Sequence, residues 1–251
     1  MTLEEEIEYR YNLLINSGKK ILNSKDDSIS FYLKLIQEIG IYDDGRKVYY
    51  DDNKFINKYS GLWQNPFQFA SLLSFLSCQN LSSYCEIGTF QCWTTFFISI
   101  VLSKKNKLKT TGIDIKFPIT NYVFDALKFF DVEYQHIIGN SNNVKNNKYD
   151  LVFIDADHSY DAIENDWNNV GQYSKICIFH DIDDLNIKNA TRENDAPKKF
   201  FDKVFKNRIA ILSDNPVMGL GIVINELTNY SEPDMIYFAA RCESERLNRL
   251  K

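Results

Sequence analysis

From residue 84 onward, short apolar runs alternate with segments of helical periodicity, and this alternation constrains the fold more than any other feature of the chain. The apolar runs have the length of strands, and the segments between them have the spacing of amphipathic helices. When helices connect successive strands, the strands pair in parallel and the helices cover both faces of the sheet. The sequence therefore predicts an α/β fold with a doubly wound, mostly parallel seven-stranded sheet of Rossmann-like type.

The alternation predicts seven strands and four connecting helices. The strands are expected at residues 84–87, 109–115, 132–138, 149–154, 175–179, 208–212 and 218–224. The helices are expected near residues 91–104, 119–130, 160–170 and 196–206. Because only residues 213–217 join the last two strands, we expect a hairpin there and an antiparallel strand at that edge of the sheet.

The first 60 residues follow a different pattern. Apolar positions between residues 3 and 40 recur at helical spacing, which predicts two amphipathic helices separated by the polar residues 23–27. Another helix is expected to begin at Asn65-Pro66, since Asn caps helices and Pro fits the first turn. We therefore expect a helical extension over residues 1–60, a doubly wound domain over residues 61–230 and a helical tail over residues 231–251.

The composition narrows the class of partner. A formal net charge of −5 argues against nucleic acid as a partner and favours a small substrate, because proteins that bind polyanions usually carry a basic face. No basic segment followed by an apolar run stands at the start, and no apolar stretch is long enough to span a membrane, so a cytoplasmic protein is expected. The five cysteines include no Cys-x-x-Cys pair, which favours reduced, packed thiols over a zinc site.

The ends of the first two strands of the alternating region hold one candidate ligand site. In a doubly wound sheet the ligand lies beyond the carboxyl ends of the strands, near the switch in strand order. Gly88, directly after the first strand, lets the backbone turn tightly and approach a ligand. Asp114 ends the second strand, where an acid can accept both hydroxyls of a ribose. Both features also occur without a ligand, as turn geometry and as a solvated strand end.

The ends of the fourth and fifth strands carry a more discriminating group. Residues 155–160 read Asp-Ala-Asp-His-Ser-Tyr, and His180-Asp181 ends the next strand. Asp155, His180 and Asp181 offer two carboxylates and an imidazole, which suits Mg²⁺ or Mn²⁺ with positions left open for substrate oxygens. His158 is predicted to be the general base, since an unperturbed histidine pKa of about 6.5 lets it accept a proton at neutral pH. Alternatively, His180 and Asp181 only pair with each other, and His158 only orients Asp155.

Taken together, these motifs resemble class I S-adenosylmethionine-dependent methyltransferases of the metal-assisted O-methyltransferase group, the macrocin and cephalosporin-pathway type. The resemblance covers roughly residues 60–226 and rests on Glu86-x-Gly88, Asp114, the 155–160 motif, His180-Asp181 and Gly219-Leu220-Gly221. It departs from such families at Asn140, where Asp is frequent, and at Cys92, where glycine is frequent.

The resemblance implies S-adenosylmethionine (SAM) as cofactor. Glu86, Gly88 and Thr89 would border its methionine end, Asp114 would bind the ribose, and Asn140-Ser141 would approach the adenine. The full cofactor-binding set is Glu86, Gly88, Thr89, Asp114, Ile115, Asn140, Ser141 and Asp155. The metal set is Asp155, His180 and Asp181, and the catalytic residues are His158 and Asp155.

The implied reaction is transfer of the sulfonium methyl group to a hydroxyl of a small acceptor. The acceptor implied by the resemblance is a sugar or nucleotide-linked sugar, for a surface glycan or a natural product, and enzymes of this type are often homo-oligomers. N-methylation of a small amine remains open. So do a metal-dependent hydrolase that uses the same aspartates and histidines, and a catalytically inactive binding module. A nicotinamide-dependent oxidoreductase is disfavoured because the first turn lacks Gly-x-Gly-x-x-Gly.

Overall fold

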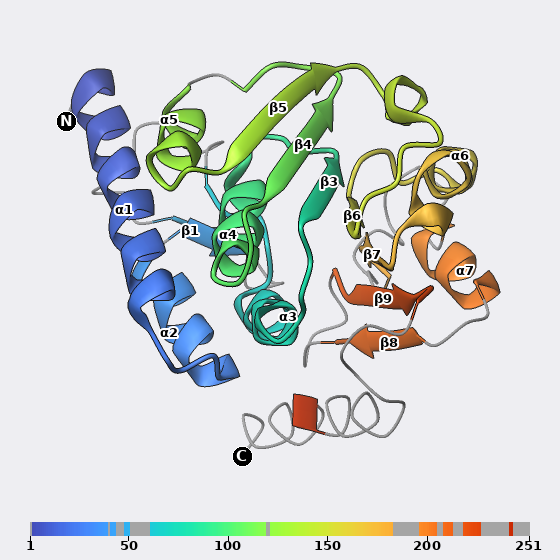
Figure 1. The fold of residues 1–251 in the computed structure, drawn as a ribbon, viewed down its shortest axis with the longest axis horizontal. Helices are drawn as coiled ribbons and strands as arrows, with labels where there is room; N and C mark the ends of the chain where they lie inside the picture. The colour runs from blue at the N-terminus through green and yellow to red at the C-terminus, as the bar shows by residue number, and fades with distance from the viewer. Residues whose placement is uncertain are drawn as a thin grey trace.

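A computed structural model of the chain describes residues 2–39, 41–43, 48–50, 61–118, 121–182, 196–204, 208–212, 218–226 and 241–242. Within these residues the predicted fold class is confirmed: an α/β fold with a doubly wound, mostly parallel seven-stranded sheet (Figure 1). Its strands are β3 (Ser83–Ile87), β4 (Lys109–Asp114), β5 (Glu133–Ile138), β6 (Leu151–Ile154), β7 (Ile176–His180), β8 (Arg208–Ile211) and β9 (Leu220–Ile224). A separate antiparallel pair, β1 (Ile41–Asp43) and β2 (Val48–Tyr50), precedes them.

The order of strands, β5-β4-β3-β6-β7-β9-β8, places the switch point between β3 and β6. From β3 the chain adds β4 and β5 on one side, and from β6 it adds β7 on the other, all in parallel. Ile87 at the end of β3 lies opposite Ile154 at the end of β6. The residues that follow these two strands therefore lie at the position where open α/β sheets bind their ligands.

The antiparallel strand was predicted at the edge of the sheet, and the structure places it one position further in. β9 lies between β7 and β8 and is antiparallel to both, so that the edge strand is β8. All five residues of β9 are buried, whereas exposed and buried residues alternate along β8. β9 takes the interior position because burial of its apolar side chains on both faces is favourable there. β8 lies at the edge, where its exposed side chains stay in contact with solvent. The connecting residues 213–217 lie outside the described part of the chain.

Helices cover both faces of the sheet, as the alternating pattern requires. α3 (Pro66–Ser77), α4 (Trp93–Ser103) and α5 (Tyr122–Phe129) belong to one hydrophobic core, which Phe153 and Ile178 join from the sheet. α6 (Tyr160–Asn169) and α7 (Ala196–Lys203) belong to the second core, on the opposite face, with Val152 and Cys177. Neighbouring residues of one strand thus point into different cores, the period of two that a strand dictates. Two short 3-10 turns complete this region, η1 (Ser141–Val144) and η2 (Gly171–Tyr173).

Both predicted N-terminal helices are present, and they form an outer layer on the first core. α1 (Leu3–Asn23) begins at a capping box between Thr2 and Glu5, and α2 (Ile29–Ile39) follows the polar break. α1 packs along α4 and α5, and α2 packs against α3 (Figure 1). The residues 51–60 before the expected domain boundary lie outside the described residues, as does the expected tail over 231–251 apart from residues 241–242.

The predicted start of α3 is confirmed. The Asn65 side-chain oxygen accepts hydrogen bonds from the backbone N–H groups of Phe67 and Gln68, and Pro66 occupies the first helical position. All twelve residues of this helix are buried, since α2 and α4 both pack against it. No helix in the described part of the chain is long and apolar enough to cross a bilayer.

Candidate functional site

The turn after β3 brings the backbone into close contact with the end of β6. Gly88 has φ of +86°, a conformation that glycine adopts easily. A Cβ at this position would lie 1.9 Å from the carbonyl oxygen of Asp155, so no side chain fits. The Gly88 N–H donates to Ile113 and the Asp155 N–H donates to Ile87, each at 2.8 Å, which fixes both turns against their neighbouring strands. Gly88 and Asp155 thus meet at the switch point.

Two further residues in this turn have left-handed backbone. Phe90 has φ of +47°, and Cys92, at the start of α4, has φ of +63°. The Cys92 conformation explains why glycine would suit this position, since residues with a Cβ are strained there. The Cys92 side chain is buried and its sulfur lies 3.4 Å from the Tyr134 hydroxyl. Packing of the Cys92 side chain therefore accompanies a backbone conformation that glycine adopts more easily.

Asp114 connects the first two strand ends. Its Oδ2 accepts a hydrogen bond from the Phe90 N–H at 2.8 Å, and its Oδ1 accepts one from the Lys116 N–H at 3.1 Å. Each oxygen has a further lone pair, so the carboxylate can still accept hydrogen bonds from a ligand. Ile115 beside it is 73% exposed and gives the site an apolar wall. Asp114 and Ile115 therefore line one cavity, and the binding of a nucleoside there stays a prediction.

A cavity of about 710 Å³ lies over this edge of the sheet. Its size is in the range of pockets for small molecules and cofactors. A second cavity, of about 30 Å³, continues toward α3 and α4 and shares Gly88, Phe90 and Asp155 with the first. The large cavity is lined by Ile87, Gly88, Phe90, Ile113, Asp114, Ile115, Gly139, Asn140, Asp155, Ala156, Asp157, Ser159, Ala162 and Asp166.

Glu86 borders the small cavity and is almost fully buried. Its Oε2 accepts hydrogen bonds from the hydroxyls of Tyr84 and Thr95, each at 2.6 Å. Burial raises the pKa of Glu86 to about 8, although these two hydrogen bonds act in the opposite direction. The side chain is therefore poised to release its proton when a positive charge enters the cavity.

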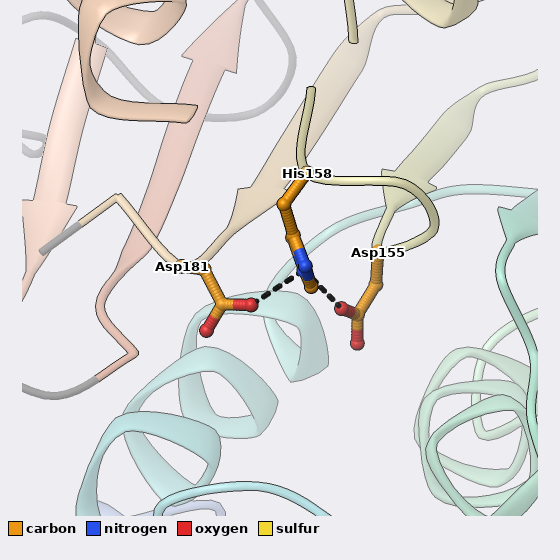
Figure 2. Close-up of side chains that lie close together, drawn as sticks. All are labelled: Asp155, His158 and Asp181. Atoms are coloured by element: carbon orange, nitrogen blue, oxygen red, sulfur yellow. Dashed lines mark ion pairs between the residues drawn. The ribbon is translucent and has the colours of Figure 1, made fainter. Parts of the chain in front are cut away.

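Four side chains from the ends of β6 and β7 form a compact cluster, which we call the carboxylate–imidazole cluster: Asp155, His158, His180 and Asp181. Figure 2 shows Asp155, His158 and Asp181 pointing toward one another. His158 Nε2 lies 2.7 Å from Asp181 Oδ2 and 3.9 Å from Asp155 Oδ1. His180 Nδ1 lies 3.1 Å from Asp155 Oδ1 and 3.2 Å from Asp181 Oδ1. Both imidazoles thus contact the same two carboxylates.

The pairing of β6 with β7 explains this proximity. Ile154 lies opposite Phe179, so Asp155 and His180 leave the sheet side by side. His158 returns toward them because the Asp157 carboxylate accepts a hydrogen bond from the Ser159 N–H at 2.8 Å, which folds the loop before α6. Asp181 adopts a left-handed backbone, with φ of +58°. The local geometry of both loops therefore turns the side chains inward.

Charge pairing dominates the electrostatics of the carboxylate–imidazole cluster. The close approach of the Asp155 and Asp181 carboxylates raises the pKa of His158 to about 10. Although burial disfavours a charged His180, the charges of the same two carboxylates raise its pKa well above the usual value. Burial is likewise outweighed at Asp181, where His180 and His158 hold the carboxyl pKa well below its usual range. With both imidazoles protonated, the charges in this cluster cancel.

The cluster has the chemistry of a hard-cation site. Within the described residues, oxygen and nitrogen atoms of Asp155, His158 and Asp181 lie within 4.8 Å of one another, close enough to coordinate one ion. The metal set predicted from the sequence contained His180 in place of His158. The structure brings all four residues together. His158 is the more accessible imidazole, with a side chain 23% exposed against 4% for His180.

The predicted cofactor residues occupy three different places. Gly88, Asp114, Ile115, Asn140 and Asp155 line the large cavity, and Glu86 and Thr89 line the small one. Ser141, the first residue of η1, lines neither of these two cavities, because its buried hydroxyl faces α6 and accepts a hydrogen bond from the Asn169 amide. Most of the predicted cofactor residues thus line one of the two cavities, whereas Ser141 lies outside both linings.

Two residues of the site were not predicted from the sequence. Gln64, before α3, is buried and its amide donates to Asp155 Oδ2 at 3.3 Å. Asp166, on α6, is buried and lines the large cavity. No local motif marks Gln64. For Asp166 there was a signal, since it lies between Ile163 and Asn169 at the three-residue spacing of a buried helix face.

Comparisons with known proteins give similar folds at low identity. No family model matches the chain, and no curated protein matches it. Among solved structures, the O-methyltransferase TomG from Streptomyces achromogenes, in complex with SAM, is 11% identical with a TM-score of 0.48, over 80% of this chain and 91% of that one. Cofactor-bound Rv0187 from MTB is 12% identical with a TM-score of 0.49, over 83% and 94% of the two chains. Similarity at this level assigns no activity to this chain.

Proposed function

We propose that this protein is a SAM-dependent O-methyltransferase that acts on a small acceptor with the help of a divalent cation, Mg²⁺ or Mn²⁺. One observation carries the proposal: Asp155 belongs at once to the cofactor-sized cavity at the switch point and to the carboxylate–imidazole cluster. A methyl donor in the cavity would lie directly beside a cation site. That juxtaposition is what metal-assisted methyl transfer to a hydroxyl requires.

The cavities fit the parts of SAM. Because Gly88 has no side chain, its turn packs directly on the Asp155 backbone, and both residues line the large cavity. Asp114 has free lone pairs at the place where a ribose would be held. The small cavity has room for about one water molecule, but the Glu86 carboxyl beside it can serve as an anionic partner for the ammonium group at the methionine end.

The donor set of the carboxylate–imidazole cluster fits a hard divalent cation. We assign Asp155, His180 and Asp181 as the residues that would hold it, since His180 is buried between both carboxylates. A bound cation would supply positive charge to acidify an acceptor hydroxyl, and it would displace the proton of its ligand His180, since metal ligands bind deprotonated. By neutralising the Asp155 and Asp181 carboxylates, it would also remove what raises the pKa of His158, so that this imidazole loses its proton more easily. His158 is the more accessible of the two imidazoles, so we assign it as the base that takes the acceptor proton.

The acceptor class rests on the sequence resemblance. A hydroxylated sugar or nucleotide-linked sugar is our proposal, because vicinal oxygens can share one cation. The same resemblance, rather than any contact in this chain, supports a homo-oligomer. The chain's own contribution to the reaction is to align donor and acceptor and to exclude water, which can be worth about 7–11 kcal/mol of the barrier.

Calorimetric titration with S-adenosylhomocysteine (SAH), with and without Mg²⁺, tests the cofactor. Asp114→Ala should weaken binding by about 30-fold or more, since it removes charged hydrogen bonds to the ribose. Asp125→Ala, at an exposed position on α5, is the control and should bind normally. Unaltered affinity in Asp114→Ala would remove this residue from the site. Failure of the native protein to bind under every metal condition would overturn the methyltransferase assignment.

Proton release on binding tests the role of Glu86. Burial raises the Glu86 pKa to about 8, so at pH 7 the carboxyl is mostly protonated before an ammonium group arrives. Binding of SAM or SAH at pH 7 should therefore release up to about one proton, and affinity should increase as the pH rises toward 8. Titrations in buffers of different ionisation enthalpy measure this proton count. Glu86→Gln should abolish this proton release. If the variant released as many protons as the native protein, the assignment of Glu86 would be contradicted.

A further inference from the structure

Asp166 is a buried carboxyl on the wall of the large cavity, and its position in the fold explains neither stability nor packing. It extends from α6, one turn after Ala162, and both residues line the cavity. Its relative exposure is 7%. Among the described residues no basic side chain forms an ion pair with it. A buried carboxylate without a cationic partner lowers the stability of the empty protein, which points to a role with a ligand.

The hydrogen bonds behind Asp166 fix the direction in which it can act. The Asn169 amide donates to the Ser141 hydroxyl oxygen at 2.9 Å and to the Asn142 side-chain oxygen at 3.2 Å. The Ser141 hydroxyl hydrogen is then free for the Asp166 carboxylate, and this hydrogen bond lowers the Asp166 pKa in part. The Ser141 hydroxyl thus serves one acceptor position of the Asp166 carboxylate. Its remaining acceptor positions belong to the cavity.

The residues that line the cavity indicate which kind of ligand group would contact Asp166. Asn140, another polar side chain on the wall of this cavity, already uses its side-chain oxygen to accept a hydrogen bond from the Asn142 N–H at 3.0 Å. The apolar side chains of Ile113, Ile115 and Ala162 line the same cavity. A flat apolar ring that carries an N–H donor at its edge fits such a slot, and an adenine with its exocyclic amine is such a ring.

We propose that Asp166 accepts a hydrogen bond from the exocyclic amine of the cofactor's adenine and makes the site specific for 6-aminopurines over 6-oxopurines. The inference rests on the proposed function, in which the cavity holds SAM. It assigns to α6 a part of cofactor recognition that suits Asp166 better than Asn140 at the end of β5, since the Asn140 side-chain oxygen is uncharged and already accepts one hydrogen bond. A 6-oxo group would place a second acceptor against the carboxylate, and that pair repels.

Binding of two ligands that differ only at this position tests the proposal. SAH and S-inosylhomocysteine are titrated calorimetrically at pH 7.5 into the native protein, Asp166→Asn and the control Asp161→Asn, which changes an exposed aspartate on the same helix. The native protein and the control should prefer SAH by about 100-fold, because a charged hydrogen bond is exchanged for a repulsive contact. Asp166→Asn should reduce the preference to within about 5-fold, since an amide can donate to the 6-oxo group.

Thermal unfolding without ligand separates this role from a structural one. Burial raises the pKa of Asp166 to about 6, with the Asp157 charge acting in the same direction, so the folded protein at pH 7.5 holds a buried charge. Asp166→Asn should therefore raise the melting temperature, by about 2–6 °C. A variant that keeps the native preference overturns the proposal, and so does one that loses both ligands equally and melts earlier. If the native protein binds neither ligand, the proposed function fails and this inference fails with it.

Discussion

Gly88→Ala should yield a protein that no longer binds SAM, although the substitution adds a single methyl group. The new Cβ would lie 1.9 Å from the Asp155 carbonyl oxygen, 2.5 Å from its carbon and 2.7 Å from the Ala156 Cα. These are backbone atoms, which cannot turn aside as the end of a side chain can. Alanine would also be strained at φ of +86° by about 1–2 kcal/mol.

Neither side of the contact can yield without loss of function. The Gly88 N–H is hydrogen-bonded to β4 and the Asp155 N–H to β3, so relief of the clash must separate β3 from β6 at their carboxyl ends. That movement would displace Asp155 from both cavities and from the carboxylate–imidazole cluster. We expect a loss of SAH affinity of at least about 100-fold and a free energy of unfolding lower by about 3–5 kcal/mol.

Calorimetry with SAH and thermal unfolding measure the two effects of Gly88→Ala. Gly171→Ala is the matched control, because its Cβ would meet only side-chain atoms, at 3.0 Å or more, and its backbone is not left-handed. The control should lose some stability and keep its affinity. Native affinity in Gly88→Ala would show that the ligand does not depend on the turn at the switch point, and it would contradict the cofactor site.

Where a site depends on sheet pairing, the sequence was sufficient to predict it. Asp155 and His180 each follow a buried apolar strand, and parallel neighbours end at the same edge, so their proximity follows from the alternation of strands and helices alone. The helix start at Asn65-Pro66 could also be predicted, because the capping residue and the first helical residue are neighbours in the sequence. In these places the pattern that forms the element also positions the functional side chain.

Where position depends on contacts between distant segments, the sequence was not sufficient. The insertion of β9 between β7 and β8 depends on which strand buries more apolar surface, and adjacency in the chain does not reveal it. Gln64 reaches Asp155 from a segment 91 residues earlier. His158 was predicted to be a base from its ordinary pKa, but two carboxylates raise that pKa to about 10 in the ligand-free cluster. Its role as a base therefore depends on what else is bound.

Asp181→Asn should abolish methyl transfer and leave SAH binding intact. Asp181 contacts both histidines, at 2.7 Å and 3.2 Å, yet it lines neither cavity assigned to the cofactor. Its replacement by the neutral amide removes one of two carboxylates from the proposed cation site. We expect Mn²⁺ affinity to fall by about 100-fold and turnover with a nucleotide-sugar acceptor to fall by about 1,000-fold, since alignment and charge are lost together.

Asparagine makes this substitution interpretable, because Asn tolerates left-handed backbone as well as Asp does. Asp131→Asn is the matched control: Asp131 also has a positive φ, of +57°, but it is exposed in the turn before β5. Mn²⁺ binding in the SAH complex, followed by electron paramagnetic resonance, measures the cation site without an acceptor. If Asp181→Asn bound Mn²⁺ like the control, the cation would lie elsewhere, and the carboxylate–imidazole cluster would serve only to pair its own charges. If Mn²⁺ binding is lost while SAH binding remains, the cation site and the cofactor site bind their ligands independently. Asp155 is then the residue that the two sites share.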